Sequence, residues 1–431
     1  MTTVFVRVSH RHLSKRNTNL SMIGRDELGH RSETVRRANL STIVRELHAN
    51  GPQTRSDLVT HSGLTRSAIR ALTGELVAGN LALEGPSELD GTPGRPSPLV
   101  RPDPDGAVVL ALEIAVDSLA AATVGLGGQV HDLVRVDLPR GRSSVADIAS
   151  GLARLSTTVR DGLAPDAVIT GIAVAVVGVV RRADGMVSMA PNLGWRDEAL
   201  GDALAATLAL DVPITFANEA DLAVLAEHRR GAARGADDVV LAWGSVGVGG
   251  GLIVAGQPLT GAAGYAGEIG HVPVNPDGRP CRCGSTGCWE TEVGFSALFR
   301  RAGYPPEAGH EAFDAILAEA EAGSSFALDA FAETGRWLGI GLAGVINVMN
   351  PRLVLLGGRL APSYPYVRAT LEAELDRRVL RAARGLVRVI PAALGEDATL
   401  LGAAELAFEP LLSDPAAWLR PRRGMAALAT A

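Results

Sequence analysis

The chain has 431 residues, more than one ordinary hydrophobic core organises, so two or three domains are expected. Hydrophobic residues make up 47% and charged residues 20%, which excludes a disordered chain and is typical of a globular protein. No apolar run is long enough to span a membrane, and the polar start lacks the apolar core of a signal peptide, so we expect a cytoplasmic protein without a membrane partner.

Charge is distributed unevenly along the chain. The formal net charge is −6, but residues 1–100 carry 13 lysines and arginines against 9 aspartates and glutamates, a net charge of +4. A basic segment on an acidic body fits a polyanionic partner for the first hundred residues. A solvated tail with scattered arginines would give the same balance, so charge alone does not decide.

The first helix is predicted just after a polar start. Residues 1–33 show no sustained apolar period and are predicted to be a disordered basic tail. From residue 34 the pattern becomes helical, and Gly51 stops the helix. The apolar face of this helix consists of Val35, Leu40, Ile43, Val44 and Leu47.

Two further helices and a ribbon follow. A short helix is predicted over Arg55–His61, a turn at Ser62-Gly63 and a second helix over Thr65–Ala78, with Thr54 and Thr65 as N-caps. Residues 81–102 predict a β-ribbon with a tip rich in glycine and proline, and a linker is expected over 102–106.

Residues 34–103 are therefore predicted to form a winged helix-turn-helix domain, which places its second helix in the major groove of double-stranded operator DNA. Arginine pairs with guanine, hydroxyl groups reach bases or phosphates, and the rigid tip Gly94-Arg95-Pro96 suits a narrow minor groove. A three-helix protein-interaction module would show the same helices. The predicted DNA contacts are Arg55, Ser56, Thr65, Arg66, Ser67, Arg70 and Arg95.

Residues 104–410 alternate between strand-like and helical stretches, which predicts α/β architecture. Residues 411–431 are predicted to be a loose C-terminal tail. The expected strands lie at 108–126, as a hairpin, and at 168–180, 212–218, 238–256 and 351–358. The expected helices cover 145–162, 197–209, 219–230, 311–322, 326–347 and 364–383.

All three cysteines of the chain fall within eight residues, and His271 lies ten residues before the first of them. One imidazole and three thiolates make a closed set of four ligands, which suits structural zinc and leaves no open position for catalysis. Free or redox-active thiols are the alternative, and a chain otherwise empty of cysteine fits them less well. We expect one Zn²⁺ per chain, held by His271, Cys281, Cys283 and Cys288.

The segment GAAGYAGEIGHVPVNPDGRPCRCGSTGCWE, residues 261–290, closely resembles the signature of the ROK family, named for repressors, open reading frames and kinases. The helix-turn-helix, the GRP segment, NLGW at 192–195 and PRLVLLGG at 351–358 fall in family order, so the resemblance covers residues 34–410. It implies an actin-like, hexokinase-like fold of two lobes with the cleft near 216–218. Members with a winged helix-turn-helix resemble repressors of xylose and N-acetylglucosamine genes.

The resemblance also implies a sugar site. In the family the sugar is held by an Asn-acid pair, by the Glu and His of the GEIGH motif and by the Glu that follows the last cysteine. Carboxylates suit such a site because they accept hydrogen bonds from adjacent hydroxyl groups. A monosaccharide or sugar phosphate is the expected effector, and a homodimer or homotetramer the expected assembly. The matching residues are Asn218, Glu219, Glu268, His271 and Glu290.

Three departures from the kinase pattern indicate that phosphoryl transfer is lost. Kinase members open the first hairpin with Asp-x-Gly-Gly-Thr, whereas residues 113–117 read Glu-Ile-Ala-Val-Asp, which places an acid beside the ATP oxygens. The second loop, normally Gly-Thr-Gly, reads Ser245-Val246-Gly247. Glu219 replaces the Asp that acts as the base, and a misplacement near 1 Å can cost about a hundredfold in rate.

The favoured function is therefore a sugar-responsive DNA-binding transcriptional regulator, a repressor of carbohydrate genes, with no catalytic residue and Glu219 at a vestigial base position. The alternative is an active ATP-dependent sugar kinase with a DNA-binding appendage. The surviving glycines at 247, 249–251 and 357–358 leave it open, although a tightly packed hairpin would need them too. A pure interaction scaffold would leave Glu268, His271 and Glu290 without a purpose.

Overall fold

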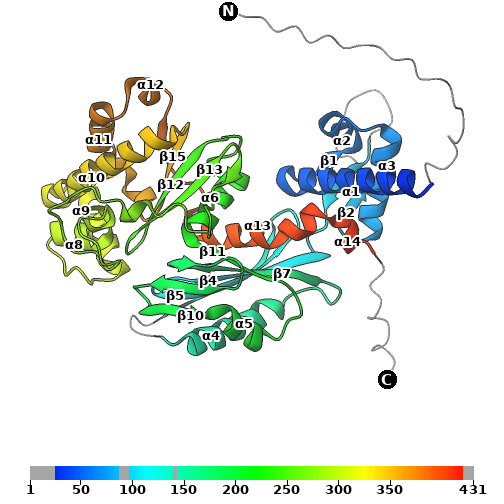
Figure 1. Ribbon diagram of the computed structural model, residues 1–431, viewed down its shortest axis with the longest axis horizontal. Coiled ribbons are helices and arrows are strands. Elements are labelled where there is room, and N and C mark those ends of the chain that lie inside the picture. The colour runs from blue at the N-terminus through cyan, green and yellow to red at the C-terminus, as the bar shows by residue number, and fades with distance from the viewer. Residues whose placement is uncertain (1–24, 87–96, 139–142, 421–431) are drawn as a thin grey trace, which may run out of the picture.

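The computed structural model describes residues 25–86, 97–138 and 143–420, which form a head and two lobes (Figure 1). The head covers residues 25–102. Lobe 1 covers residues 103–218 together with the C-terminal helix α13 (Ala398–Ser413), and lobe 2 covers residues 219–397. No helix among the described residues is long and apolar enough to cross a membrane.

The head contains three helices, α1 (Arg25–Asn50), α2 (Arg55–Ser62) and α3 (Arg66–Ala78). Both predicted N-caps are confirmed, because the hydroxyl groups of Thr54 and Thr65 accept hydrogen bonds from the backbone of the first turns of α2 and α3. Gly63 takes the left-handed conformation (φ 69°) that ends α2. A small antiparallel sheet completes the head, in the order β1 (Gln53–Thr54), β3 (Leu99–Pro102), β2 (Ala82–Gly85).

Helix α1 begins at Arg25, so the predicted disorder is wrong for residues 25–33, and residues 1–24 lie outside the described part of the chain. The apolar period in the sequence begins only after residue 33. The residues before it show no apolar stripe that periodicity could detect, although Glu27, Leu28 and Arg31 are good helix formers.

Lobe 1 is built on a five-stranded sheet. The strand order is β11 (Ile214–Asn218), β7 (Val168–Val176), β4 (Ala107–Ile114), β5 (Ser118–Gly125), β6 (Val130–Asp137). Helices α4 (Val145–Arg160) and α5 (Leu200–Leu208) cover one face, where Leu110 and Leu112 of β4 are buried. Helix α13 covers the opposite face, where Val109 and Ala111 are buried. A smaller sheet joins β8 (Val179–Val180), β9 (Met186–Ala190) and β10 (Trp195–Ala199).

One helix boundary in lobe 1 differs from the prediction. The helix expected over 197–209 begins at Leu200, because Trp195–Ala199 pairs with Met186–Ala190 as strand β10. Cross-strand pairing to a partner in the preceding hairpin overrides the helical pattern at this point.

Lobe 2 repeats the sheet topology of lobe 1. Its order is β14 (Gln257–Pro258), β13 (Val248–Val254), β12 (Val239–Gly244), β15 (Leu353–Gly358), β16 (Arg388–Pro391), with an antiparallel hairpin next to two parallel strands, as in lobe 1. Helix α6 (Glu219–Arg230) covers one face. The other face carries α7 (Glu290–Val293), α8 (Phe295–Arg301), α9 (His310–Glu321), α10 (Ser325–Met349), α11 (Leu360–Arg378) and α12 (Arg381–Arg384). The predicted two-lobed α/β architecture is confirmed.

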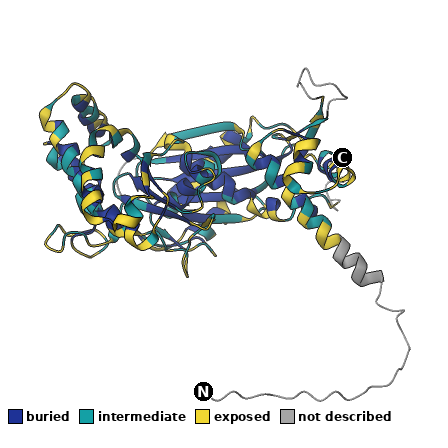
Figure 2. Ribbon diagram, turned by 90° about the horizontal axis from the view of Figure 1, so that it is seen from above, coloured by how far each residue is buried: buried dark blue, intermediate teal, exposed yellow. Residues whose placement is uncertain are grey.

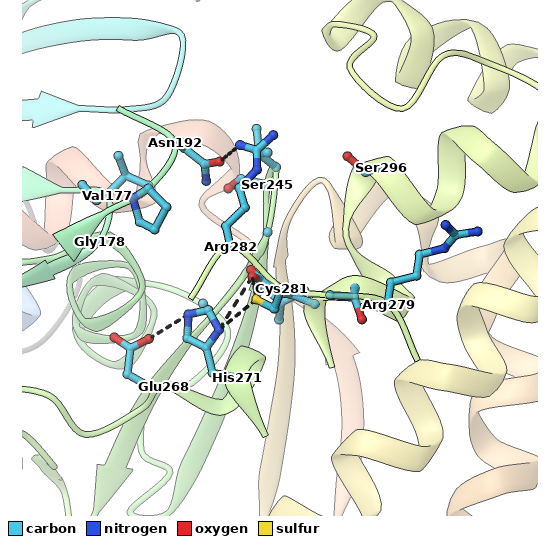
Figure 3. Close-up of a pocket in the computed structure, with 18 of the residues that line it drawn as sticks. Val177, Gly178, Asn192, Ser245, Glu268, His271, Arg279, Cys281, Arg282 and Ser296 are labelled. Atoms are coloured by element: carbon cyan, nitrogen blue, oxygen red, sulfur yellow. Dashed lines mark hydrogen bonds and ion pairs between the residues drawn. The ribbon is translucent and has the colours of Figure 1, made fainter. Parts of the chain in front are cut away.

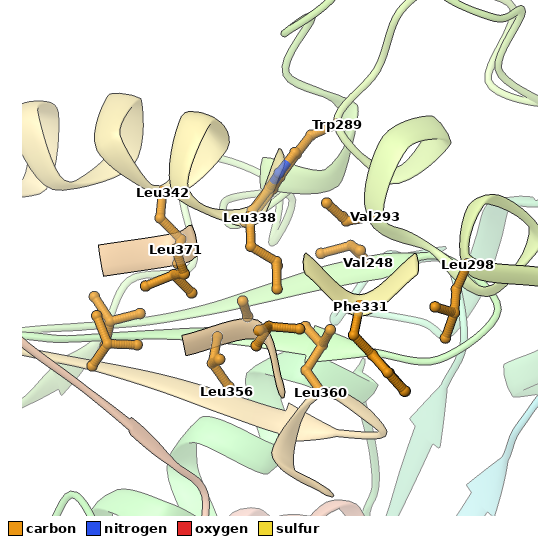
Figure 4. Close-up of a cluster of buried hydrophobic side chains, with 14 of the residues drawn as sticks. Val248, Trp289, Val293, Leu298, Phe331, Leu338, Leu342, Leu356, Leu360 and Leu371 are labelled. Atoms are coloured by element: carbon orange, nitrogen blue, oxygen red, sulfur yellow. The ribbon is translucent and has the colours of Figure 1, made fainter. Parts of the chain in front are cut away.

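Trp289 anchors the core of lobe 2 beside the cysteine cluster (Figure 4). The side chain is fully buried and its indole N–H donates to the carbonyl of Trp337, 2.8 Å away. Gly341 of α10 makes room for the ring, because a Cβ there would lie 2.2 Å from it. The residue that directly follows the last cysteine is therefore fixed to the core.

The head and lobe 1 share one hydrophobic core. Leu40, Ile43 and Leu47 of α1 belong to the same buried cluster as Phe408 of α13, and Figure 2 shows buried residues continuing from the lobes into the head. Helix α14 (Pro415–Trp418) packs on α1, so the predicted loose tail is wrong for residues 411–420. Its apolar run is too short to show a period. The predicted linker is also packed, with Asp103 buried, and residues 421–431 lie outside the described part.

Candidate functional site

A cavity of about 290 Å³ lies between the two lobes (Figure 3). Lobe 1 contributes Gly178 and the segment 190–192, and lobe 2 contributes the loop 245–249 and the segment that carries the cysteines. All five residues predicted to bind sugar line this one cavity: Asn218, Glu219, Glu268, His271 and Glu290.

Asn218 ends strand β11 and caps helix α6. Its amide oxygen accepts from the backbone N–H of Ala220 at 2.8 Å, and its amide nitrogen donates to the carbonyl of Gly178 at 3.0 Å. These two hydrogen bonds fix the side chain at the N-terminus of the helix and leave its second amide N–H for a ligand.

Glu219 and Glu268 line the same cavity, and the charge of Glu268 acts on Glu219. Burial, followed by the charges of Glu113 and Glu268, raises the pKa of Glu219 to about 8. Burial also raises the pKa of Glu268, which the neighbouring His271 lowers and Glu290 raises. At neutral pH Glu219 is therefore mostly protonated and can donate a hydrogen bond, and the fraction able to act as a general base is reduced.

This proton gives a measurable pH dependence. Folded Glu219 keeps it up to about pH 8, whereas the ordinary pKa is 4.5, so the free energy of unfolding falls as pH rises through this interval. We expect Glu219→Gln to match the wild type near pH 4.5 and to exceed its free energy of unfolding by on the order of 3 kcal/mol near pH 8.5, measured by urea titration. Glu311→Gln, at an exposed position, is the control. A difference in the free energy of unfolding that does not change with pH would contradict the raised pKa of Glu219.

The four predicted metal ligands converge. One donor atom from each of His271, Cys281, Cys283 and Cys288 lies within 4.8 Å of the others. The sulfurs of Cys283 and Cys288 are 3.7 Å apart, and Cys281 Sγ is 3.7 Å from His271 Nδ1. Two sulfurs around one tetrahedral ion would be about 3.8 Å apart, so the donor set fits a metal ion.

The imidazole of His271 connects this cluster to the cavity. Its Nδ1 faces Cys281, while its Nε2 lies 3.7 Å from Glu268, on the side of the cavity (Figure 3). Glu290 lies beside the cluster as well, because its Oε1 is 2.9 Å from Cys281 Sγ while the side chain lines the cavity. The thiol of Cys281 donates this contact, which a metal-bound thiolate would lose, so a metal ion bound here would fix the orientation of the His271 ring toward a ligand.

The first of the two loops that correspond to the phosphate loops of kinases contacts the other lobe. Asp117, in the turn between β4 and β5, forms an ion pair with His310 at the start of α9 in lobe 2. The glycine run at 249–251 is required by packing, since a Cβ on Gly250 would lie 2.4 Å from the carbonyl of Gly267, and one on Gly251 2.3 Å from that of Ala220. The survival of these glycines therefore carries no evidence for a nucleotide.

The predicted DNA-contacting residues gather at the start of α3. Thr65, Arg66, Ser67 and Arg70 are exposed, and within the described residues neither Arg66 nor Arg70 has an ion pair. Ser56 is also exposed. Arg55 differs, because its guanidinium pairs with Glu84 of β2 at 2.6 Å. Arg95 lies outside the described residues.

Three residues near the cavity were missed in the sequence. Asn192 and Arg282 form a hydrogen bond from lobe 1 to lobe 2, and His310 forms the ion pair described above. Asn192 belongs to the NLGW motif, which was a usable signal. Nothing local marks Arg282 or His310, whose partners lie 90 or more residues away in the chain.

Comparison with known proteins gives two kinds of relative. Glucokinase of Streptomyces coelicolor is 30% identical over 321 residues, which are 70% of this chain and 98% of that protein. The xylose repressor of Bacillus subtilis is 26% identical over 380 residues, 88% of this chain and 97% of the repressor.

Two solved structures show the same division. A ROK family transcriptional regulator homologous to the E. coli Mlc protein is 26% identical, with a TM-score of 0.71 over 89% of this chain and 97% of that one. A ROK family glucokinase of Streptomyces griseus, in complex with glucose and AMPPNP, is 28% identical, with a TM-score of 0.59 over 70% and 99%. The ROK family model matches residues 109–409, and the chain is therefore a member of the ROK family.

Proposed function

We propose that the chain is a sugar-responsive DNA-binding transcriptional repressor of carbohydrate genes, whose cleft binds sugar without phosphorylating it. The observation that carries this proposal is the presence, in one chain, of a cavity lined by all five residues predicted to hold sugar and of an exposed basic helix start in the head. The xylose repressor and the Mlc homologue match nearly nine tenths of the chain, whereas the two glucokinases match 70%. The head is thus part of what this chain shares with repressors.

The cavity supplies complementary groups for sugar hydroxyls. Glu268 and Glu290 accept hydrogen bonds, Asn218 offers one N–H, and protonated Glu219 offers an O–H. Such a mixture orients a small polyol, because each hydroxyl both donates and accepts. A monosaccharide or its phosphate fits this chemistry.

The residues that the kinase pattern uses for phosphoryl transfer are replaced in this chain. Ala115, Val116 and Val246 occupy the places where the kinase pattern has glycines and a threonine, and Asp117 pairs with His310. Because Glu219 is mostly protonated at neutral pH, only a minor fraction of it could take a proton from a sugar hydroxyl. The identity to a glucokinase favours the alternative of an active kinase. A coupled assay with ATP, magnesium and a panel of sugars separates the two functions, because turnover near about 1 per second would be ordinary kinase behaviour.

The metal in the cluster is proposed to be structural Zn²⁺, one per chain. Three thiolates and one imidazole are ligands that zinc prefers, and four of them fill a tetrahedral shell. Zinc would cross-link the segment 271–288 through its four ligands. It would hold Nδ1 of His271 and so direct Nε2 toward the sugar.

The head is proposed to be a winged helix-turn-helix that reads operator DNA as part of a homodimer, with α3 in the major groove. We expect Arg66→Ala and Arg70→Ala each to weaken binding by about 1–3 kcal/mol and to relax preference at one base position, because each guanidinium would lose a bidentate contact to guanine. Binding is measured on duplexes selected from a random pool at fixed salt.

The control for this test is Arg196→Ala, an exposed arginine on lobe 1. It should leave both affinity and sequence preference unchanged. If deletion of residues 1–103 leaves the selected duplexes bound, the assignment of DNA binding to the head is wrong.

A further inference from the structure

One imidazole of the head contacts two different helices of the body. His48 lies in the last turn of α1, and its side chain is 4% exposed. Its Nδ1 accepts from the backbone N–H of Gly127 at 3.0 Å, which leaves Nε2 as the donor to Glu405 of α13 at 3.2 Å. The ring also packs edge-on against Phe408. The end of α1 is therefore fixed to the body at a buried polar point.

Arg230, the last residue of α6, completes this point. Its Nε donates to Glu405 at 2.5 Å and its Nη1 to the carbonyl of Gly127 at 2.8 Å, while Nη2 donates to the backbone carbonyl of His48 at 3.5 Å. The turn is shaped for the guanidinium, because a Cβ on Gly128 would lie 2.3 Å from it. The side chain of Glu405 is 5% exposed, so these charges depend on one another for solvation.

Helix α6 connects this junction to the cavity. It begins at Glu219, which lines the cavity and follows the cap Asn218, and it ends at Arg230. Its twelve residues span about 18 Å. A helix transmits displacement along this distance as a rigid body, so a ligand that moves its first turn also moves Arg230.

The crossing of α6 and α13 makes the junction sensitive to lobe motion. Helix α6 packs on the sheet of lobe 2, whereas α13 packs on the sheet of lobe 1. Their backbones come close where Gly402 faces the carbonyl of Leu222, eight residues before Arg230. Arg230 thus lies about 12 Å from the crossing, and a rotation of about 5° would move it by about 1 Å. Such a shift would lengthen a hydrogen bond beyond the usual donor–acceptor distance.

We propose that Arg230 is the positioning residue through which sugar in the cleft sets the orientation of the DNA-binding head, acting on His48 of α1 and Glu405 of α13. The proposal rests on the sugar-binding function proposed above. Sugar between the lobes rotates α6 against α13, the Arg230–Glu405–His48 contacts rearrange, and the end of α1 follows. Coupling between two sites requires such a shared element with different contacts in the two states.

The test measures backbone hydrogen exchange by mass spectrometry on the full chain, with and without D-glucose, D-xylose or N-acetyl-D-glucosamine. A sugar that binds should slow exchange in residues 214–222 and 268–290, and in the wild type it should also change exchange in residues 43–51. Because allosteric couplings are typically about 5- to 150-fold, we expect a change of about fivefold or more there. In Arg230→Met the protection of the cavity should persist while the response of residues 43–51 disappears.

Two further variants make the result specific. Glu405→Gln preserves volume and removes the charge that holds Arg230, so it should lose the same response. It replaces Arg230→Met as the test if that variant folds poorly. Arg229→Ala, the neighbouring residue without an ion pair among the described residues, should keep the full response. A purely structural role would change exchange at 43–51 equally with and without sugar.

The outcomes separate the two proposals. A wild type whose cavity is protected while residues 43–51 do not respond would overturn the role of Arg230. So would an Arg230→Met variant that keeps the response. If none of the three sugars protects the cavity, the sugar-binding function itself is contradicted, and the inference fails with it.

Discussion

Cys283→Ser is expected to produce a protein without bound metal whose melting temperature is lower by about 5 °C. Metal binding to a thiolate site contributes directly to folding free energy, because the unfolded chain lacks the preformed site. The strand pairing within the described segment 271–288 consists of two isolated β-bridges, Pro273 with Cys288 and Pro280 with Thr286. A loss on the order of 3–5 kcal/mol is therefore expected.

The measurements are metal content by mass spectrometry and thermal unfolding with and without a chelator. Thr286→Ala is the matched control, because Thr286 is exposed in the same segment and is not one of the four ligands. Native protein that contains no metal, titrates three free thiols and melts at the same temperature as Cys283→Ser would refute the metal site.

Glu268→Ala is expected to abolish the sugar response while leaving DNA affinity unchanged, which would give a repressor that ignores its signal. The carboxylate lines the cavity and lies 3.7 Å from His271, so its loss removes a charged acceptor and frees the imidazole. Hydrogen bonds to charged groups contribute about 1.5–3 kcal/mol, so sugar affinity should fall on the order of 100-fold. Thermal shift with sugar and DNA binding with sugar are the two readouts.

Asp277→Ala provides the control for this effect. Asp277 is exposed in the same segment and does not line the cavity. It should keep both sugar affinity and sugar-dependent release of DNA. An equal loss in the two variants would mean that the segment as a whole was disturbed and that Glu268 has no specific role.

Much of the site was predictable because its members are close in the sequence or stand in recognisable motifs. The metal ligands span residues 271–288, so their convergence follows from a short loop that turns back on itself. The meeting of Asn218 with Glu268 was not predictable from spacing. It was inferred from the resemblance to a family, and the cavity between the lobes brings the two residues together as that resemblance implied.

The remaining features depend on contacts between distant parts of the chain. Arg55 looked like a DNA-contacting arginine because nothing in the sequence places Glu84 beside it. The attachment of the head to the body was likewise not predictable from the sequence, since Ser41 of α1 donates to the carbonyl of Leu412, 371 residues away. Local periodicity reports which face of a helix is apolar, but it does not report which element covers that face.

The packing of α14 on α1 has a consequence for biosynthesis. The ribosome makes the head first, yet the surface of α1 that carries Leu40 and Ile43 is completed by α13 and α14, which are made last. The indole N–H of Trp418 even donates to the carbonyl of Gly79, at the end of α3. A nascent chain can form the helices of the head early, because domains fold in order of synthesis. It cannot seat the head on lobe 1 until α13 and α14 have left the ribosome, so a chain that stops before these helices lacks the contacts that join the head to the body.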